Sequence, residues 1–402
     1  NMAYQNLKTL YYKKYNIEEE LNKRLENPCT LKTELVISPV IKGEKLPSEK
    51  YNLFYLPINN ILFLEEQIFS NSKKVTDIFS QLPYIAQNKC IEEVMINEII
   101  KTNKIEGVIS TKKDISESLN TKKTRFTGIV NKYKEITEGN LEKINSVEEI
   151  RKIYDDIFKE DILKNPENEL DGKLFRKNPV YIQDGIKKIH SGSLSEEAII
   201  SQLNDLIKFM NIKNVNSLIK ACITHYYFEY IHPFYDGNGR FGRFLFSVYL
   251  ARKIDILTGL SLSYAIFLNK EKYLKLFLET SESKNCGELT FFIEGMLEII
   301  IQGQESIISM LEKKHLKLEY ALNYIEELEL SVEEADILFI LTQNYIFSNS
   351  PLKDSELCTY INLSPYKLKG YIKKLSEESY VETISRRPLI HSIGDKLKKV
   401  LE

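Results

Sequence analysis

Apolar residues recur at helical spacing over much of the chain. In "NSVEEIRKIYDDIF", residues 145–158, Ile150, Ile153 and Tyr154 share one face with Ile157, and Ser146 stands three residues before Glu149 as in a capping box. The segment after Ser195 repeats the spacing at Ile199, Leu203, Leu206, Ile207 and Met210. Glycine is scarce, with 16 residues among 402, as expected where few turns are needed. The pattern predicts an all-α fold.

One segment departs from helical periodicity. In "NPVYIQDGIKKIHSGS", residues 178–193, the run Val180, Tyr181, Ile182 favours a strand. Asp184-Gly185 is typical of a turn, and a second short run reaches Ile189. We predict a small β-hairpin on a helical body.

The pattern changes again near residue 325. Ser331 and Glu334 form a second capping box, followed by a short helix, a turn at 362–364, a helix from about Pro365 and strand-like runs around Val381 and Leu389. This order indicates a winged helix-turn-helix. Residues 365–402 hold nine Lys or Arg and five Asp or Glu, so DNA contact and protein contact both remain open.

Composition narrows the class of protein. A chain of 402 residues has room for two or three domains of roughly 100–200 residues each. The net charge of -2 gives no overall attraction to nucleic acid or to an anionic membrane. The five cysteines form no CxxC pair, and no apolar run reaches the roughly 18 residues of a membrane span. We expect a cytoplasmic protein without a membrane partner.

The most informative stretch is "HPFYDGNGRFGR", residues 232–243. It lies between two apolar segments that each predict a buried helix, so Gly237, Asn238 and Gly239 stand at the start of the second helix. The first amides of a helix lack internal acceptors and attract anions, and glycine lets an oxyanion approach the backbone. Arg240 and Arg243, three residues apart, can bind phosphate oxygens, which favours a di- or triphosphate ligand.

Two further side chains of this stretch suggest chemistry. Asp236 offers the single carboxylate that a phosphate-bridging Mg²⁺ prefers. His232 has a side chain suited to a general base near neutral pH, while Phe234 is expected to point into the core.

A metal-binding face and a P-loop are two other interpretations of this part of the sequence. His225, Glu229 and His232 fall at i, i+4 and i+7 and could form a metal-binding face, although no HExxH pattern accompanies them. The apolar surroundings of His225 favour a core residue instead. The chain has no Gly-x4-Gly-Lys-Ser/Thr, which excludes a typical P-loop.

The twelve residues resemble the Fic family, whose motif is His-x-Phe-x-Asp/Glu-Gly-Asn-Gly-Arg-x-x-Arg. The resemblance implies a Fic-fold helical core and a protein adenylyltransferase, which transfers AMP from ATP to a Ser, Thr or Tyr hydroxyl of a target protein, with the chain itself as one such target. By this likeness His232 is the base and Asp236 holds Mg²⁺. Gly237, Asn238 and Gly239 form the anion hole, where Asn238 can cap the helix or donate to the anion, and Arg240 and Arg243 hold the β- and γ-phosphates.

Two other stretches resemble parts of the same family. The predicted hairpin at Val180, Tyr181 and Ile182 is similar to the family's flap, which would dock an extended target segment as an added strand. Residues 263–277 resemble the segment near the adenine pocket, with Asn269 and Tyr273 as candidate contacts. Tyr273 fits a plain core position equally well.

An upstream segment is similar to the family's inhibitory helix. The pattern Ser/Thr-x-x-x-Glu-Gly/Asn matches Thr102 through Glu106 and Gly107. The resemblance implies that Glu106 pairs with Arg243 and so prevents productive ATP binding. The chain would then be autoinhibited.

Together, these patterns and the resemblance predict that the chain has three regions. These are a helical N-terminal region with the inhibitory motif at 1–125, a Fic core at 126–320 and a winged-helix-like module at 321–402. Two other functions stay open. The chain could be an ATP-sensing helix-turn-helix regulator that transfers nothing, or an enzyme that removes AMP from a modified protein. A homodimer is also compatible with the sequence.

Overall fold

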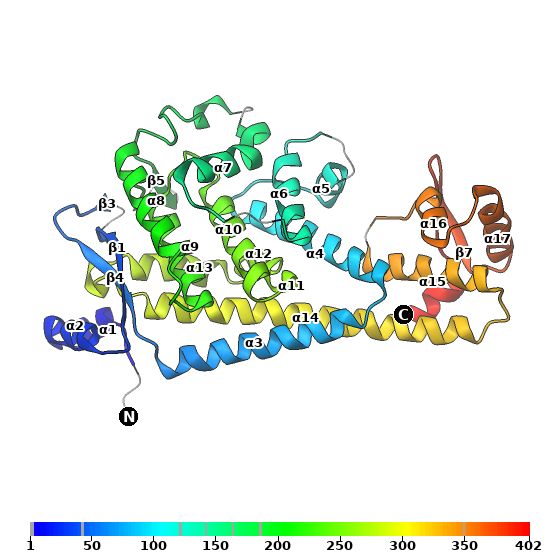
Figure 1. The fold of residues 1–402 in the computed structure, drawn as a ribbon, viewed down its shortest axis with the longest axis horizontal. Coiled ribbons are helices and arrows are strands. Elements are labelled where there is room, and N and C mark those ends of the chain that lie inside the picture. Colours follow the sequence, from blue (N-terminus) through cyan, green and yellow to red (C-terminus); the bar gives the residue numbers. More distant parts are fainter. Residues whose placement is uncertain are drawn as a thin grey trace. The chain divides into compact units, whose positions relative to one another are not determined.

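The computed structural model describes residues 4–41, 44–119, 123–140, 143–162, 165–184, 187–348 and 350–402. Helices dominate, and the strands form short antiparallel pairs, which confirms the predicted helical fold class (Figure 1). The chain packs as two compact units, Asn1–Ser72 with Asn97–Gln304 and Lys73–Ile96 with Glu305–Glu402. The unit boundaries fall within the helices α3 Asn59–Ser80, α4 Tyr84–Ile105 and α14 Thr290–Glu326. The predicted N-terminal region 1–125 therefore contributes to both units.

The first unit is built around α9 Ser217–Ile231 and α10 Asn238–Lys253. Helix α9 is buried on nearly every side, because its sequence is apolar around the whole circumference. The other helices of this unit are α1 Leu7–Tyr12, α2 Ile17–Glu26, α5 Lys112–Leu119, α6 Thr127–Glu138, α7 Val147–Ile162, α8 Glu196–Met210, α11 Ile256–Gly259, α12 Leu262–Leu268 and α13 Lys270–Thr280, with 3-10 turns at Pro166–Asn168 and Ser283–Asn285.

Predicted helix starts agree with the structure. Ser195 caps α8 by accepting from the Ala198 N–H, and Ser146 accepts from the Glu149 N–H at 3.3 Å. The Glu149 carboxylate returns to the Asn145 N–H, one residue earlier than a capping box requires. The signals that start these helices are local, so the sequence alone predicts them.

The N-terminal part is less helical than expected. Strand β1 Leu31–Ile37 pairs with β4 Tyr51–Tyr55, and β2 Val40–Ile41 pairs with β3 Glu44–Lys45. Thr33, Leu35 and Ile37 are buried and alternate with more exposed residues, which is the period of a half-buried strand. The predicted helical N-terminal region 1–125 therefore also contains strands between residues 31 and 55.

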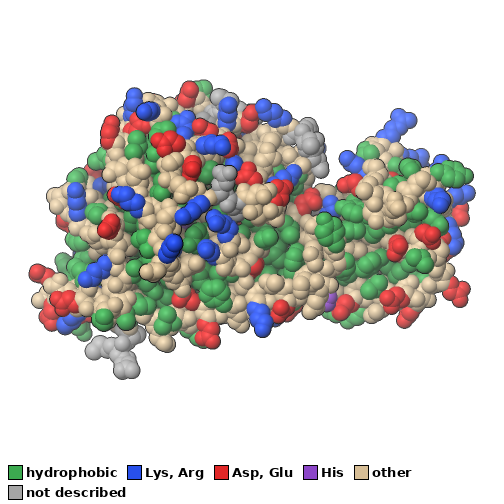
Figure 2. Space-filling view, in the orientation of Figure 1, with side chains coloured by type: hydrophobic (Ala, Val, Ile, Leu, Met, Phe, Trp, Pro, Cys, Tyr) green, Lys and Arg blue, Asp and Glu red, His purple; other side chains and the backbone are tan. Residues whose placement is uncertain are grey.

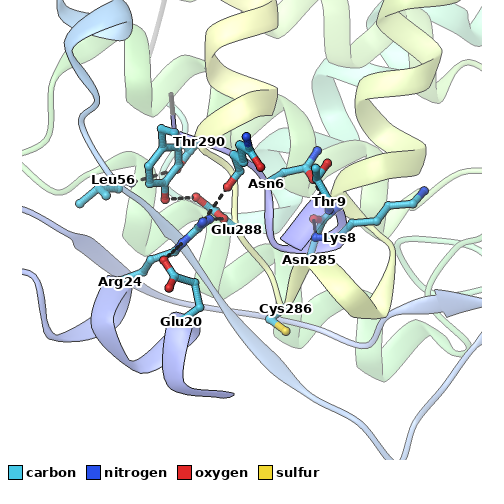
Figure 3. Close-up of polar contacts among 12 residues, drawn as sticks. Asn6, Lys8, Thr9, Glu20, Arg24, Leu56, Asn285, Cys286, Glu288 and Thr290 are labelled. Atoms are coloured by element: carbon cyan, nitrogen blue, oxygen red, sulfur yellow. Dashed lines mark hydrogen bonds and ion pairs between the residues drawn. The ribbon is translucent and has the colours of Figure 1, made fainter. Parts of the chain in front are cut away.

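The first residues are tied to the same unit by a buried ion pair. Nη1 of Arg24 lies 2.5 Å from Oε2 of Glu288, and both side chains are almost fully buried (Figure 3). Tyr4 donates to the other oxygen of Glu288, and Oδ1 of Asn285 accepts from the Lys8 N–H. Removing one partner of such a pair leaves an uncompensated buried charge. The contacts hold α1 and α2 against the start of α14.

The second unit has its own core and ends in α15 Val332–Phe347, α16 Asp354–Ile361, α17 Pro365–Glu377, β7 Val381–Arg386, β8 Leu389–Ile393 and α18 Asp395–Leu401. Ser331 and Glu334 form the predicted capping box, and Asn362 turns the chain between α16 and α17 with φ 51°. Its core includes Leu338, Leu357, Leu368, Leu375, Ile393 and Leu397. The element order agrees with the prediction for this segment, and the winged-helix assignment stays an interpretation.

The surface carries mixed charge. On the face in Figure 2, Lys and Arg side chains are interspersed with Asp and Glu, in keeping with the small net charge. Among the described residues, no helix combines the length and apolar character needed to cross a membrane.

Candidate active site

The 232–243 segment forms the connection between α9 and α10. His232 ends α9 in the left-handed region with φ 53°, and Gly237 precedes α10 with φ 82°. A Cβ at 237 would also approach the Phe158 ring at 3.3 Å, so glycine is required there by both backbone and space. The sharp turns at both helix ends bring His232 and the start of α10 to one site.

Asn238 and Phe234 hold the loop in shape. The Phe234 N–H donates to Oδ1 of Asn238 at 2.9 Å, and Nδ2 of Asn238 donates to the Phe234 carbonyl at 2.8 Å. The Phe234 ring is fully buried and stacks on Tyr154 with centroids 3.5 Å apart, as expected for a core anchor. The side chain of Asn238 therefore bridges the loop through one donated and one accepted hydrogen bond.

The start of α10 presents an anion cradle, defined here as the backbone N–H groups of residues 238–240. The first intrahelical bond runs from the Phe241 N–H to the Gly237 carbonyl, so these three amides have no acceptor within the helix. The N–H of Gly237 itself binds Oδ1 of Asp236. The helix dipole adds partial positive charge at the same place.

His232 lies beside this cradle, and its side chain is 13% exposed. Burial and the nearby Arg176 charge lower the pKa of His232 to about 4, so its imidazole is neutral at pH 7. Nδ1 lies 3.8 Å from Oε2 of Glu229 and makes no hydrogen bond with a described residue. Burial raises the pKa of Glu229 to about 8, so this contact joins two neutral groups at pH 7. A neutral imidazole can accept a proton.

Arg176 is a site residue that the sequence analysis missed. Its buried guanidinium donates to the carbonyls of His232 at 2.8 Å, Ser193 at 2.7 Å, Asn178 at 2.6 Å and Ile231 at 3.3 Å. A Cβ at Gly192 would collide with its Nη2. Arg176 thus joins the end of α9 to the base of the hairpin β5 Tyr181–Asp184 and β6 Lys187–Ser191.

Asp236 lies at the open edge of the site. Its side chain is 46% exposed, Oδ2 accepts from Nδ2 of Asn168 at 3.2 Å, and Nη2 of Arg240 is 3.6 Å away. In the described part of the chain, no group of three His, Cys, Asp or Glu side chains could hold a metal ion. One hard oxygen ligand suits Mg²⁺ when phosphate oxygens supply further ligands.

The two arginines of the segment have different partners. Nη1 of Arg240 donates to Asp161 on α7 at 2.8 Å, and its guanidinium lies over the Phe158 ring. Asp161 was not predicted, and its separation of 79 residues from Arg240 gives no signal in the sequence. Arg243 is 1% exposed and faces the end of α4.

The end of α4 carries the predicted inhibitory motif. Nη2 of Arg243 donates to Oε1 of Glu106 at 2.7 Å, and its Nε donates to Oγ1 of Thr102 at 2.9 Å. Gly107 ends the segment with φ 74°. The Glu106 side chain is 36% exposed, and although partial desolvation opposes ionisation, Arg243 lowers the pKa of Glu106 below its ordinary value, so the carboxylate is charged. A Cβ at Gly239 would collide with Oε1 of Glu106, which places this carboxylate over the anion cradle.

The hairpin lies where the sequence predicts it. The Gly192 N–H donates to the Val180 carbonyl, and the Ser193 N–H donates to the Ile231 carbonyl, so the hairpin begins beside His232. Tyr181 is 39% exposed. Ile182 pairs with His190 in the backbone register, while its side chain and the turn residue Gly185 lie outside the described residues.

The proposed adenine contacts are engaged within the fold. Tyr273 is buried and its hydroxyl lies 2.7 Å from Nε2 of His225. Asn269 donates to the Ala265 carbonyl and to Oε1 of Gln302. Because His225 contacts Tyr273, it is a core residue here and does not share a metal face with His232. The adenine role of both residues stays a prediction.

Comparisons with known proteins agree with the geometry. Residues 144–250 match the Fic/DOC family. A probable protein adenylyltransferase of Aquifex aeolicus is 40% identical over 72 residues, and the protein adenylyltransferase fic-1 of Caenorhabditis elegans is 34% identical over 62 residues. The matched parts are 18% and 15% of this chain, and the chain spans only 20% and 12% of the lengths of these two relatives.

The fold has a solved counterpart. A Fic family protein from Desulfovibrio desulfuricans superposes with a TM-score of 0.54 at 17% identity, over 85% of this chain and 98% of that one. At 17% identity, this superposition shows that the two proteins share a similar fold.

Proposed function

We propose that the chain, whose residues 144–250 match the Fic/DOC family, transfers AMP from ATP to a hydroxyl of a target protein. The observation that carries the proposal is the His232 side chain beside a helix start whose first three amides have no acceptor within the helix. The two curated relatives named as protein adenylyltransferases support the same reaction class.

His232 would act as the general base. Its neutral imidazole accepts the proton of the target hydroxyl, whose oxygen then forms a bond to the α-phosphorus. The bond from that phosphorus to the oxygen shared with the β-phosphate breaks, and pyrophosphate leaves with the electron pair. Arg176 keeps His232 in place through the carbonyl at the end of α9.

The cradle and the arginines would bind the triphosphate. The amides of residues 238–240 face the negative charge that develops on the phosphate oxygens. Arg240, held by Asp161, and Arg243 would contact the outer phosphates. Asp236 would hold Mg²⁺, which supplies charge neutralisation between phosphates when bound.

Glu106 would inhibit this reaction. Its carboxylate binds the guanidinium of Arg243 and lies over the cradle at Gly239, so it excludes an outer phosphate by both charge and space. The hairpin would present the target segment beside His232.

Intact-mass spectrometry after incubation with ATP and Mg²⁺ tests the proposal. The Glu106→Gly protein is expected to gain one AMP by self-modification at least about tenfold faster than the parent, because Arg243 and the cradle become free. Lys104→Gly is the matched control, since it places glycine in the same last turn of α4 but leaves Glu106 and Arg243 paired. His232→Ala in the Glu106→Gly protein should lose about 10²–10⁴-fold in rate while it still binds ATP.

Two results would contradict parts of the proposal. Equal labelling of the Glu106→Gly and Lys104→Gly proteins would remove Glu106 as the inhibitor. ATP binding to the Glu106→Gly protein by calorimetry, with no AMP transfer to itself or to a cell extract, would favour the ATP-sensing regulator.

A further inference from the structure

A cavity of about 320 Å³ lies in the first unit between the end of α8, helix α9 and helix α10. Its size is at the lower end of small-molecule sites in proteins. None of the residues proposed for adenylyl transfer lines it. Gly242 of the 232–243 segment lines the cavity, but the residues to which a role in catalysis or phosphate binding is proposed do not.

The walls of the cavity are apolar. Met210 from α8, Phe228 from α9, and Leu245, Phe246 and Val248 from α10 contribute to them. Such a lining favours an apolar body in the ligand, because burial removes that surface from water.

The polar lining is strongly cationic. Five basic residues line the cavity: Lys143, Lys213, Lys220, Arg252 and Lys253. None of the described lining residues is acidic, and none of the five cations forms an ion pair with a described carboxylate. Lys143, Lys213, Arg252 and Lys253 are exposed, so they stand around the rim. The chain has a net charge of -2, yet five cations line one cavity without a carboxylate among its described lining residues. This local excess of positive charge favours binding of an anion.

Lys220 is the buried member of this set. It is 6% exposed, and its Nζ donates to the Ile212 carbonyl as its one hydrogen bond among the described residues. Burial and the neighbouring charges of Lys253 and Lys143 lower the pKa of Lys220. Such a shift is expected where like charges repel one another. His225 also lines the cavity, and its Nδ1 is buried without a hydrogen-bond partner in the described part of the chain. Buried polar atoms without partners are rare in folded proteins.

We propose that this cavity binds a small organic anion, with a carboxylate or phosphate at the basic rim and Lys220 and an acyl or aryl body among Met210, Phe228 and Phe246. The negative charge of the ligand balances the positive charge of the five cations. Its apolar body occupies the space between the apolar walls. A ligand with a bare phosphate and no apolar body leaves the walls unfilled.

Isothermal titration calorimetry on the full chain tests this with matched probes. Octanoate and octyl phosphate carry the same apolar chain with different anionic heads, and octanol and octylammonium carry neutral and cationic heads. We expect saturable binding of at least one anion, at least about tenfold tighter than octanol or octylammonium. Equal binding of all four, or no binding of either anion at millimolar concentration, would overturn the proposal. The two anions distinguish a carboxylate site from a phosphate site.

Variants locate the binding. Lys220→Met keeps the length of the side chain and removes its charge, and should weaken anion binding about tenfold, which is about 1.4 kcal/mol. Thr224→Phe fills the cavity from α9 and should abolish binding of every probe. Lys208→Met is the control, because Lys208 is exposed on α8, pairs with Asp205 and does not line the cavity. Thermal unfolding checks that each variant is folded, and unchanged anion binding in folded Thr224→Phe would place the ligand elsewhere.

Discussion

Arg176 holds the backbone of His232 in place and, after burial, contributes to the lowered pKa of its imidazole. A buried cation usually has a carboxylate partner, but this guanidinium binds backbone carbonyls at the end of α9 and at the hairpin base. The negative end of a helix dipole lies at the same carbonyls, which compensates part of the charge. The remaining charge disfavours a second cation nearby and adds to the effect of burial, which is the larger cause of the lowered His232 pKa.

This arrangement predicts the pH dependence of transfer in the Glu106→Gly protein. Protonation of His232 removes the base, so the rate falls as the pH drops through its pKa, which lies near 4 instead of 6.5. Arg176→Gln removes a charge that depresses this pKa, so the acidic limb should move to higher pH. Single-turnover rates between about pH 4.5 and 8 measure the limb, with circular dichroism at each pH to detect unfolding.

Arg151→Gln is the control for this shift. Arg151 also binds a backbone carbonyl, that of Leu174, but it pairs with Asp155 on α7. If the acidic limb of the pH–rate profile lies at the same pH in the Arg176→Gln and Arg151→Gln proteins, Arg176 does not contribute to the low pKa of His232.

At the scale of elements, the end of α4 carries the predicted inhibitory motif, and the same helix carries a buried carboxyl that holds it in place. Glu98 is fully buried and accepts from the Ser263 N–H at 2.8 Å and from Oγ of Ser247 at 3.2 Å. It therefore joins α4 to α12 and α10. Glu106 and Thr102 reach Arg243 from the same helix, so their placement depends on this packing.

Glu98 predicts a pH dependence of stability. Burial raises its pKa to about 7 from an ordinary 4.5, so the folded state binds this proton more tightly than the unfolded state. The associated stability is present below pH 4.5 and is lost as the pH rises through 7. Glu98→Gln should remove up to about 3 kcal/mol of this decline.

Urea unfolding at about pH 5 and pH 8 measures the effect. Glu271→Gln is the control, because Glu271 is exposed on α13. The same loss of stability between the two pH values in the parent and in Glu98→Gln would remove Glu98 as its source.

At the scale of the whole molecule, the proposed chemistry and the core of the second unit lie in different compact units. The residues from 102 to 107 and from 176 to 243 all belong to the first unit, whereas Leu338 and its neighbours in α15 belong to the second. A defect confined to the second core should therefore not change the catalytic geometry.

Leu338→Ala and Ile223→Ala form a matched pair for this prediction. Each removes a fully buried aliphatic side chain and should cost about 2–5 kcal/mol in its own unit. Below the unfolding temperature, Leu338→Ala in the Glu106→Gly protein should keep its AMP-transfer rate within about twofold, while Ile223→Ala on α9 should lower it. Loss of transfer in folded Leu338→Ala would contradict this separation.

Local features of the site could be predicted from the sequence, and its distant partners could not. The caps at Ser195 and Ser331 depend on residues within one turn of a helix. The end of α9 at His232 and the start of α10 after Gly237 follow from Pro233 and the glycines. In contrast, β1 and β4 were missed, because the partners Leu31 and Tyr55 meet across 24 residues and each strand is short.

By itself, the sequence determined the helical class, the hairpin before α8 and the twelve residues that predict an anion site at a helix start, because these depend on short-range backbone preferences. The likeness to a known family added the pairing of Glu106 with Arg243, which the structure contains at 2.7 Å. Only the tertiary structure decided that four carbonyls hold Arg176, that Asp161 binds Arg240 and that five cations gather at one cavity. Burial and long-range electrostatics depend on which distant segments pack together, and local sequence does not specify that packing.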